Sequence, residues 1–319
     1  MTRLAVTSLA ALVALHLYAG PAAAQLTTTF VSEARGDNAN PCTFVAPCRS
    51  FQAAHDHTLS DGQITVLDPG SYGPINITKS ISVVNDGIGE ASIPVSGGLT
   101  GISVNAPAGG GYVNIRGITV QGIGFGGGTG LRFNSGFALT ISNCVFRNLT
   151  QDGVVVFPLG SDDALVSVSD TLMNDNGRYG IEILETSGSK LKVTLARIEA
   201  SHNSLGGLFL SGENAGSVVS ATVSDSVVSG NLGQGLFARS IGAGTANLMV
   251  LNSVASYNFT GILAQATNAT VRIGQSRITG NISESWDNSS GPAKVLSYGD
   301  NYVDGNGDGD PAPPSIARK

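Results

Sequence analysis

Hydrophobic and polar residues alternate in short segments along the chain, and these segments recur at a nearly constant spacing. One aliphatic column of the pattern advances from Ile115 to Ile273 in steps of 26, 27, 27, 28, 27 and 23 residues. Alternation with a period of two predicts β-strands that bury one face. The members of this column are Ile115, Ile141, Val168, Leu195, Val223, Val250 and Ile273.

Two further columns keep the same period. In the first, a glycine precedes an aliphatic residue, at positions 101, 130, 153, 180, 207, 235 and 261. Asparagine adopts left-handed turn conformations readily and can stack its amide on the asparagine of the next repeat. The second column therefore predicts a ladder of asparagine side chains just before the glycine. Its members are Asn148, Asn176, Asn203, Asn231 and Asn258.

The repeat unit consists of strands and turns, and this determines the fold class. Helical repeats are excluded because no segment of the unit has an apolar period of 3.6 residues. Each strand must therefore pair with its equivalent one repeat away, as in a solenoid. The sequence predicts an all-β fold, a right-handed parallel β-helix of about eight coils over residues 63–305.

The N-terminus predicts export. Arg3 precedes an apolar run that ends at Ala19, and small residues follow up to Ala24. This pattern is typical of a bacterial secretory signal peptide over residues 1–24, so we expect a secreted or periplasmic protein. No later stretch approaches the roughly 20 apolar residues that a membrane-spanning helix needs.

The two ends of the solenoid are expected to differ in structure, with a folded cap at the N-terminal end and a polar tail at the C-terminal end. Residues 25–62 are predicted to form a cap over the first coil. Ser50 is a suitable N-cap for a short helix over residues 51–57, which Gly62 would end. Residues 306–319 are predicted to be a polar C-terminal tail. The apolar face of the helix would carry Phe51, Ala54, His55 and Leu59.

Composition and charge narrow the partners. Only 13% of the residues are charged, and the net charge is -6 with no basic run, which argues against nucleic acid as a partner. Cys42 and Cys48 are close enough in sequence to form a disulfide in an oxidising compartment. Cys144 is left over, and its strand-like surroundings predict a buried thiol.

Four segments near the start of the chain are informative. They are Phe30-Val31-Ser32, Gly36-Asp37-Asn38-Ala39-Asn40-Pro41-Cys42, Pro47-Cys48-Arg49-Ser50-Phe51-Gln52-Ala53-Ala54 and Ile64-Thr65-Val66-Leu67-Asp68-Pro69-Gly70-Ser71-Tyr72. They resemble the capped start of extracellular polysaccharide-lyase-type β-helices. Over residues 29–305 the chain is similar to the pectin-lyase-like right-handed parallel β-helix proteins, which implies this fold and at most a polysaccharide as substrate class. Of the catalytic motifs of the galacturonan hydrolases in this group, only the pair Asp162-Asp163 is present.

The strand that follows each glycine carries the candidate binding residues. Its second residue should face solvent, and Phe209 and Phe237 would form a platform against which sugar rings stack, bordered by Arg239, Glu185 and Glu213. In the alternative interpretation, this apolar stripe is covered by the C-terminal segment with Trp286 and Tyr298, or by a second subunit through self-association. The outward row consists of Arg132, Val155, Glu182, Phe209, Phe237 and Leu263.

Two clusters of acidic residues are candidates for Ca²⁺. The turn after the same strand should bring together Asp162, Asp163, Glu185 and Glu213 with Lys190, Lys192 and Arg239. We expect a solvated ion-pair rim there, with a Ca²⁺ or substrate site as the alternative. Near the C-terminus, Asp304, Asn306, Asp308 and Asp310 are spaced as in a Ca²⁺ loop, with a polar tail as the default interpretation.

Two classes of function remain. The first is a secreted, non-catalytic β-helix that binds a polysaccharide or acts at the cell surface. The second is a polysaccharide lyase or glycoside hydrolase acting on an acidic polysaccharide. The first is favoured because an active site usually contains converging titratable groups, and the sequence indicates few of them.

Overall fold

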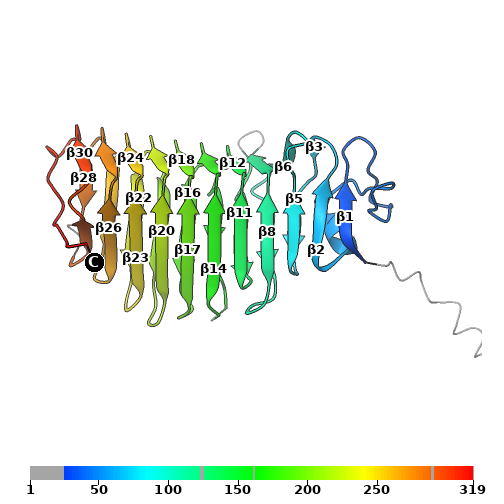
Figure 1. Cartoon of the computed structure of the whole chain (residues 1–319), viewed down its shortest axis with the longest axis horizontal. Coiled ribbons are helices and arrows are strands. Elements are labelled where there is room, and N and C mark those ends of the chain that lie inside the picture. Colours follow the sequence, from blue (N-terminus) through cyan, green and yellow to red (C-terminus); the bar gives the residue numbers. More distant parts are fainter. Residues whose placement is uncertain (1–24, 123–125, 161, 289–290, 319) are drawn as a thin grey trace, which may run out of the picture.

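The computed structural model describes residues 25–122, 126–160, 162–288 and 291–318 as one elongated stack of strands (Figure 1). The predicted signal peptide, residues 1–24, lies outside the described residues. Within the described chain, no helix is long and apolar enough to cross a membrane. Three parallel sheets of 11, 10 and 9 strands wind around a common core, so the predicted β-helix of about eight coils is confirmed.

Each sheet takes one strand from each successive coil. Sheet A contains β1 (Leu26–Val31), β2 (Thr58–Val66), β5 (Ile81–Val84), β8 (Tyr112–Arg116), β11 (Ala138–Ser142), β14 (Ala164–Ser169), β17 (Lys190–Ala196), β20 (Val218–Ser224), β23 (Thr245–Leu251), β26 (Ala269–Gly274) and β29 (Lys294–Ser297). Sheet B contains β3 (Gly70–Ser71), β6 (Ala91–Val95), β9 (Ile118–Gly122), β12 (Val145–Arg147), β15 (Leu172–Asn174), β18 (Glu199–Ser201), β21 (Val227–Ser229), β24 (Val254–Ser256), β27 (Arg277–Thr279) and β30 (Tyr302–Asp304). Sheet C contains β4 (Ile75–Ile77), β7 (Ile102–Asn105), β10 (Leu131–Ser135), β13 (Val154–Val156), β16 (Tyr179–Glu185), β19 (Gly206–Gly212), β22 (Gln234–Ser240), β25 (Thr260–Gln265) and β28 (Glu284–Asp287).

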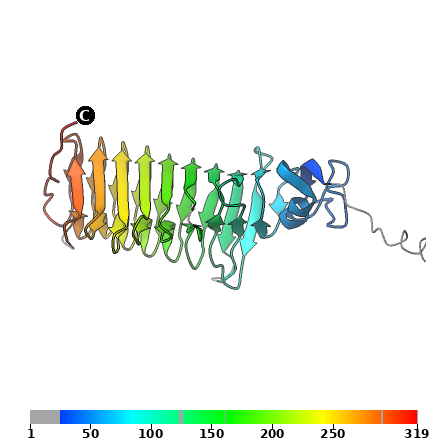
Figure 2. The same ribbon diagram turned by 90° about the horizontal axis from the view of Figure 1, so that it is seen from below.

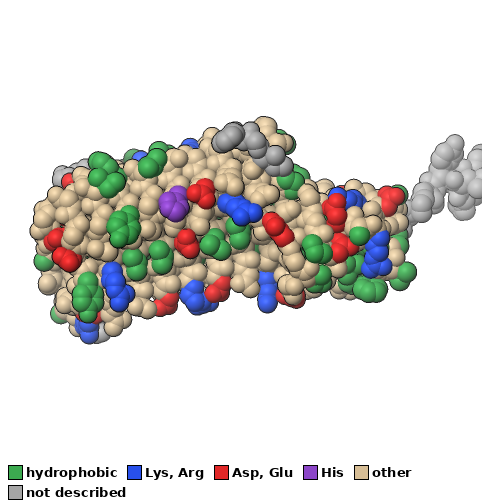
Figure 3. Space-filling model, turned by 90° about the horizontal axis from the view of Figure 1, so that it is seen from above, with side chains coloured by type: hydrophobic (Ala, Val, Ile, Leu, Met, Phe, Trp, Pro, Cys, Tyr) green, Lys and Arg blue, Asp and Glu red, His purple; other side chains and the backbone are tan. Residues whose placement is uncertain are grey.

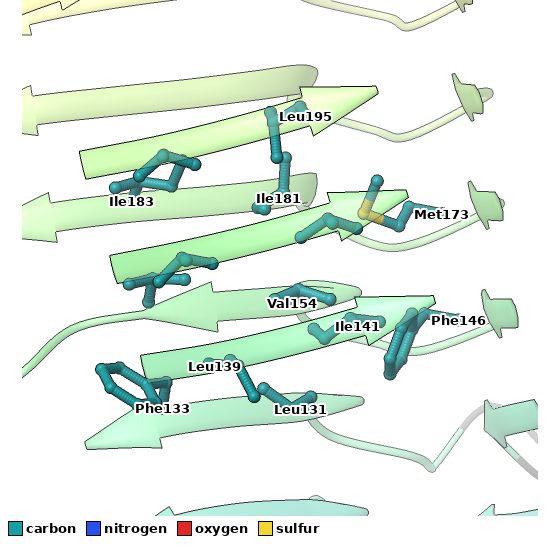
Figure 4. Close-up of a cluster of buried hydrophobic side chains, with 14 of the residues drawn as sticks. Leu131, Phe133, Leu139, Ile141, Phe146, Val154, Met173, Ile181, Ile183 and Leu195 are labelled. Atoms are coloured by element: carbon teal, nitrogen blue, oxygen red, sulfur yellow. The ribbon is translucent and has the colours of Figure 1, made fainter. Parts of the chain in front are cut away.

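The core is formed by the inward residues of all three sheets. Ile141 pairs with Ile115 on one side and with Val168 on the other, so the aliphatic column of the sequence is one row of the core. Figure 4 shows such rows from facing strands meeting in the interior, with Leu131 and Val154 opposite Leu139 and Ile141. Like side chains therefore stack on like side chains at the strand spacing of about 4.8 Å.

An asparagine ladder runs through the turns between sheets B and C. The Asn203 side chain donates to Oδ1 of Asn231 at 3.0 Å and to the carbonyl of Met173 at 3.0 Å. The prediction of a ladder is correct, but its first member was wrong. Leu149 is buried at that position, whereas Asn148 is exposed with a positive φ of 56°. The ladder consists of Asn176, Asn203, Asn231, Asn258, Asn281 and Asn306.

A second, shorter ladder follows the turns between sheets A and B. The backbone N–H of Ser226 donates to Oγ of Ser253, whose own N–H donates to Oγ of Ser276, both at 3.2 Å. Cys144 occupies the same inner corner in an earlier coil, where its thiol is free and buried as predicted. Burial raises the pKa of this thiol to about 11, which makes it a weak nucleophile.

The N-terminal cap contains the one described helix, α2 (Phe51–His57), at the blue end of the stack in Figure 2. The Oγ of Ser50 accepts from the Ala53 N–H at 3.3 Å, which is the predicted N-cap. The predicted end at Gly62 was wrong, because Thr58 already begins β2. The expected cap, residues 25–62, also contains β1, which pairs with β2 and places the first strand of sheet A before residue 63.

The disulfide between Cys42 and Cys48 is present, and both residues are fully buried against α2. It closes the loop that leads into the helix. Covalent closure here fixes the cap on the strand edge that would otherwise be open to pairing with another chain.

The C-terminal segment closes the opposite end. The N–H of Ser297 donates to the Pro314 carbonyl and the N–H of Ile316 donates to Ser297, both at 2.8 Å, so this segment covers the edge of β29. Nε1 of Trp286 donates to the Pro311 carbonyl at 2.7 Å. The residues expected to form a tail are therefore packed on the last coil as far as they are described.

Candidate functional site

The outward row predicted for sheet C exists as a continuous row. Strand pairing places Arg132 beside Val155, Val155 beside Glu182, Glu182 beside Phe209, and Phe209 beside Phe237. Leu263 continues the row on β25. Although these side chains lie outside the core, Glu182, Phe209 and Phe237 are only 8%, 4% and 8% exposed. Something on the same surface must cover them.

The cover consists of neighbouring side chains of the same face. The ring of Tyr179 stacks on Phe209 at 5.1 Å, and Phe237 lies 4.8 Å from Phe209 on the other strand. The guanidinium of Arg239 is 4.8 Å from the Phe209 centroid. The rings therefore stack on one another along the solenoid axis, and the faces of Phe209 are occupied rather than open to a sugar.

The C-terminal segment does not provide this cover, so that alternative is wrong. Trp286 pairs with Ile262 at the end of sheet C and packs against the core. Tyr298 lies beside Met249 on the outer face of sheet A. The row also offers little apolar area to a second copy of the chain, because its aromatic rings are already buried within one copy.

Two carboxyl groups converge on one arginine at this row. Nε of Arg178 is 3.4 Å from Oδ2 of Asp152, and Nη2 of Arg178 is 3.2 Å from Oε1 of Glu182. Oδ1 of Asp152 accepts from the Tyr179 N–H at 3.0 Å. Asp152 and Arg178 lie in the loops that lead into β13 and β16. Glu182 thus accepts a hydrogen bond from Nη2 of Arg178, whereas Asp152 lies at ion-pair distance from Nε, which has no hydrogen-bond partner among the described residues.

Burial dominates the electrostatics of both acids. It raises the pKa of Glu182, the nearby Asp152 raises that pKa further, and Arg178, Arg132 and Arg239 lower it without reversing the direction. Burial also raises the pKa of Asp152, against the Tyr179 N–H and the charge of Arg178. Desolvation outweighs the arginines because a buried carboxylate loses more hydration than partly exposed cations return.

A groove of about 690 Å³ lies at the turns between sheets B and C, which precede the acid pair in sequence. Its wall includes Gly177, which directly precedes Arg178, and Thr150, two residues before Asp152. His202 also lines the groove, and its Nδ1 is 3.8 Å from Oδ1 of Asp175. We use the name sheet C site for the outward row, the acid pair with Arg178, and this groove taken together.

The charged turn predicted after the sheet C strands is only partly assembled. Glu213 forms an ion pair with Arg239 at 2.9 Å. Glu185 is instead fully buried, and its Oε1 accepts from the N–H and hydroxyl of Ser187, both at 2.6 Å. Its Oε2 has no hydrogen-bond partner among the described residues. Glu185 therefore does not line the rim.

The remaining members of that turn are dispersed. Oδ1 of Asp163 accepts from the backbone N–H of Lys190 at 2.9 Å, so this contact involves no ammonium group. Lys190 and Lys192 belong to β17 of sheet A. Asp162 lies near Gly109 of an earlier coil. A converging set of charges is thus confined to Glu213 and Arg239.

The acidic C-terminal segment uses its oxygens within the chain. Oδ1 of Asn306 accepts from Asn281 in the ladder, and Asp310 accepts from the N–H groups of Gly305 and Asn306. Oδ2 of Asp308 accepts from the N–H and hydroxyl of Ser285. In the described chain, no three carboxylates here, including Asp304, bring oxygens within 4.8 Å of one another.

Comparison with known proteins places the chain in a family. Residues 100–307 match the family model described as the right handed beta helix region. The chain belongs to the right-handed β-helix family. The structure of the pectate lyase Pel9A is similar with a TM-score of 0.55 and 17% identity, over 91% of this chain and 82% of that one. A rhamnogalacturonan lyase is similar with a TM-score of 0.49 and 11% identity, over 91% and 89% of the two chains.

These likenesses confirm a pectin-lyase-like parallel β-helix and concern the fold alone. No curated protein matches the chain. On the face shown in Figure 3, hydrophobic side chains are dispersed among polar and charged ones. Function must therefore be argued from the residues of the sheet C site.

Sequence reasoning missed three residues of this site, namely Asp152, Arg178 and Tyr179. A signal was available, because Asp152 and Tyr179 directly precede the repeat glycines Gly153 and Gly180. Residues at the entry to the same sheet in adjacent coils must be neighbours. The residues just before the repeat glycines therefore form a column of spatial neighbours, as the residues after them do.

Proposed function

We propose that this chain is a secreted β-helix that binds a polysaccharide at the sheet C site without cleaving it. The observation that carries the proposal is a row of three arginines along sheet C. Arg178 contacts the buried Glu182 at 3.2 Å, and Arg132 and Arg239 lie on β10 and β22, to either side of it along the solenoid axis. Arginine recognises carboxylate and vicinal hydroxyl oxygens through a planar fork of donors. The similar structures are those of a pectate lyase and a rhamnogalacturonan lyase, whose names give polysaccharides as their substrates. This supports a polysaccharide as the ligand class.

The spacing of the arginines fits an extended chain of sugars. Arg132 lies on β10 and Arg239 on β22, with β13, β16 and β19 between them. Four strand steps correspond to about 19 Å along the solenoid axis. A carbohydrate lying along the axis would meet a donor group at several of its residues. Its flank would rest in the groove beside Gly177.

Asp152 and Glu182 act in this proposal by orienting Arg178. Both acids are nearly inaccessible; Glu182 accepts a hydrogen bond from the guanidinium, and Asp152 forms an ion pair with it at 3.4 Å. A catalytic acid must reach the glycosidic oxygen or an attacking water, which these carboxyl groups do not do in this arrangement. Secretion is supported by the predicted signal peptide over residues 1–24 and by the disulfide.

The second candidate function is a glycoside hydrolase or polysaccharide lyase. One observation favours it, since two adjacent carboxyl groups with raised pKa values resemble the acid that protonates a leaving group. This function requires Arg178 to swing away from Glu182 when substrate binds. It would act on the same ligand class at the same site.

Binding and turnover are measured on the secreted protein with a glycan array followed by calorimetry. Arg178→Gln and Arg239→Gln should each weaken binding by about tenfold or more. Arg197→Gln is the matched control, because Arg197 pairs with Asp170 in the turn between sheets A and B. Equal losses in all three variants, or no binding to any glycan, would overturn the proposal.

Catalysis is tested separately by incubating pectate, alginate and related polymers with the protein and Ca²⁺. Ultraviolet absorbance detects unsaturated lyase products, and a reducing-end assay detects hydrolysis. Formation of either product by the wild type and its loss in Glu182→Gln would reject the non-catalytic function and establish the second candidate.

A further inference from the structure

Sheet A carries a charge opposite to that of the chain. The protein has a net charge of -6, yet the strands of sheet A contain five basic residues and a single acidic one, Asp61 of β2. The basic residues are Arg116, Lys190, Lys192, Arg272 and Lys294. Of these, Arg116 pairs with Asp86. The outer face of this sheet is therefore a basic surface on an acidic protein.

Arg272 is the most unusual of these cations. It lies on β26 with its backbone neighbours Val271 and Ile273 buried, so its side chain faces outward and is half-buried. Strand pairing places Met249 of β23 on one side of it and Leu296 of β29 on the other. No hydrogen bond or ion pair joins Arg272 to another residue of the described chain. Its side chain thus leaves the sheet between two apolar neighbours, and no acid of the described chain pairs with it.

A pocket of about 840 Å³ opens at this position. The outer face of sheet A forms its floor, and the C-terminal segment forms a wall through the hydrogen bonds that join Ser297 to Pro314 and Ile316. Its apolar lining comes from half-buried side chains. These are Met249, Leu251, Leu296, Tyr298 and Ile316.

The acid of the pocket is already occupied. Oδ2 of Asp300 pairs with Arg318, and its Oδ1 accepts from the Gln275 N–H at 3.1 Å. These contacts leave the positive charge of Arg272 uncompensated by Asp300. The pocket therefore combines an apolar lining with one unpaired, hydrogen-bond-donating cation.

We propose that this pocket binds an amphipathic carboxylate, a small molecule with an apolar body and one carboxylate group. The carboxylate pairs with the guanidinium of Arg272, and the apolar body lies against Met249, Leu296 and Ile316. A guanidinium with apolar flanks binds a carboxylate strongly because the pair is shielded from water on both sides. The apolar lining contributes through the surface that ligand and protein remove from water. This site is separate from the sheet C site and does not depend on its function.

Binding is measured by calorimetry of the full secreted chain with decanoate, below the concentration at which decanoate forms micelles. We expect saturable binding of one decanoate per chain. Decanol and decyltrimethylammonium, which keep the apolar body and lack the carboxylate, should bind at least about tenfold more weakly. Arg272→Gln should weaken decanoate binding by about 10- to 100-fold.

Two variants keep the test decisive. Lys192→Gln removes the same charge from the same face of sheet A outside the pocket, and it should leave decanoate affinity unchanged. Leu296→Ser removes apolar lining without touching the cation, and it should weaken decanoate and decanol alike. The proposal fails if decanoate does not bind saturably, or if Lys192→Gln and Arg272→Gln have the same effect. It also fails if decyltrimethylammonium binds as well as decanoate does.

Discussion

The side-chain amide of Asn203 donates to Oδ1 of Asn231, one coil further on, at 3.0 Å. The same oxygen accepts from the Asn203 backbone N–H at 2.9 Å, while Nδ2 of Asn231 donates to the Ala200 carbonyl at 3.0 Å. One side chain therefore satisfies three buried polar groups that belong to the preceding coil. This arrangement fixes the register of each coil on the next.

Replacement of Asn231 by alanine should destabilise the solenoid by about 3 kcal/mol, because two buried donors of Asn203 and the Ala200 carbonyl lose their partner. The control is Asn247→Ala on the outer face of β23, which should change stability by less than about 0.5 kcal/mol. Thermal and denaturant unfolding of the protein measure both. Similar stabilities for the two variants would show that the ladder is dispensable.

Gly207 is predicted to tolerate no side chain. A Cβ at this position would lie 2.2 Å from Cγ1 of Val228 and 2.9 Å from the Gly235 carbonyl. Gly207→Val should therefore cost about 2 kcal/mol or more through overpacking, whereas Glu213→Ala, which breaks a partly exposed ion pair, should cost less than about 1 kcal/mol. Denaturation midpoints decide between them, and equal midpoints would contradict the close packing of the turn.

Stability should depend on pH through Glu182. Burial raises the pKa of Glu182 in the folded chain. In the unfolded chain the same carboxyl group loses its proton at about pH 4, whereas in the folded chain it keeps the proton to a higher pH. The folded state then binds more protons than the unfolded state, so the stability of the wild type falls as pH rises above that value. Glu182→Gln has no group that titrates at this position. The melting temperature of the variant minus that of the wild type should therefore increase between about pH 4 and neutrality.

The control for this experiment is Glu90→Gln, which replaces an exposed acid. Its melting temperature should follow that of the wild type over the same pH range. If the melting temperature of Glu182→Gln instead falls relative to the wild type as pH rises, the ion pair with Arg178 has a larger effect on the pKa of Glu182 than burial has. The pKa of Glu182 would then be lowered, not raised.

The stacked rings Phe209 and Phe237 should serve stability more than recognition. Both are buried outside the core, so the double change to serine should lower the free energy of unfolding by about 3 kcal/mol. Arg239 lies over the Phe209 ring, so the double change can displace it. Any loss of glycan affinity in the folded fraction should come from this displacement of Arg239. Unchanged stability together with complete loss of glycan binding would instead support the prediction that the two rings form a platform for sugars.

The sequence was sufficient for the fold because the repeat is nearly uninterrupted. Once Ile115, Ile141 and Val168 are recognised as one column, parallel pairing and an aliphatic core follow from strand geometry. The Asn148 error has a physical cause. The coil at residue 148 reaches the ladder position one residue later, with Leu149, and neighbouring letters in a sequence do not reveal that shift.

The site was less predictable because side-chain positions depend on more than the strand pattern. Alternation correctly places Glu182 and Phe209 on the outer face, but it does not reveal that Arg178 and Tyr179 fold over them. Glu185 illustrates the opposite error. It follows the inward parity of Ile181 and Ile183, and the hydrogen bonds of the following turn make its burial feasible.

The turns that connect the sheets differ in how much length they absorb. Two residues join sheet A to sheet B in every coil from β11 to β26, whereas sheet C is joined to sheet A by four residues after β16, five after β19 and three after β25. The asparagine and serine ladders pass through the other two corners and keep their contacts despite these differences. Loop length therefore varies mainly at the corner between sheets C and A, where Glu213 lies. Extra residues inserted there would lengthen the loops beside the outer face of sheet C and deepen that face into a cleft, while the two ladders kept every coil in register.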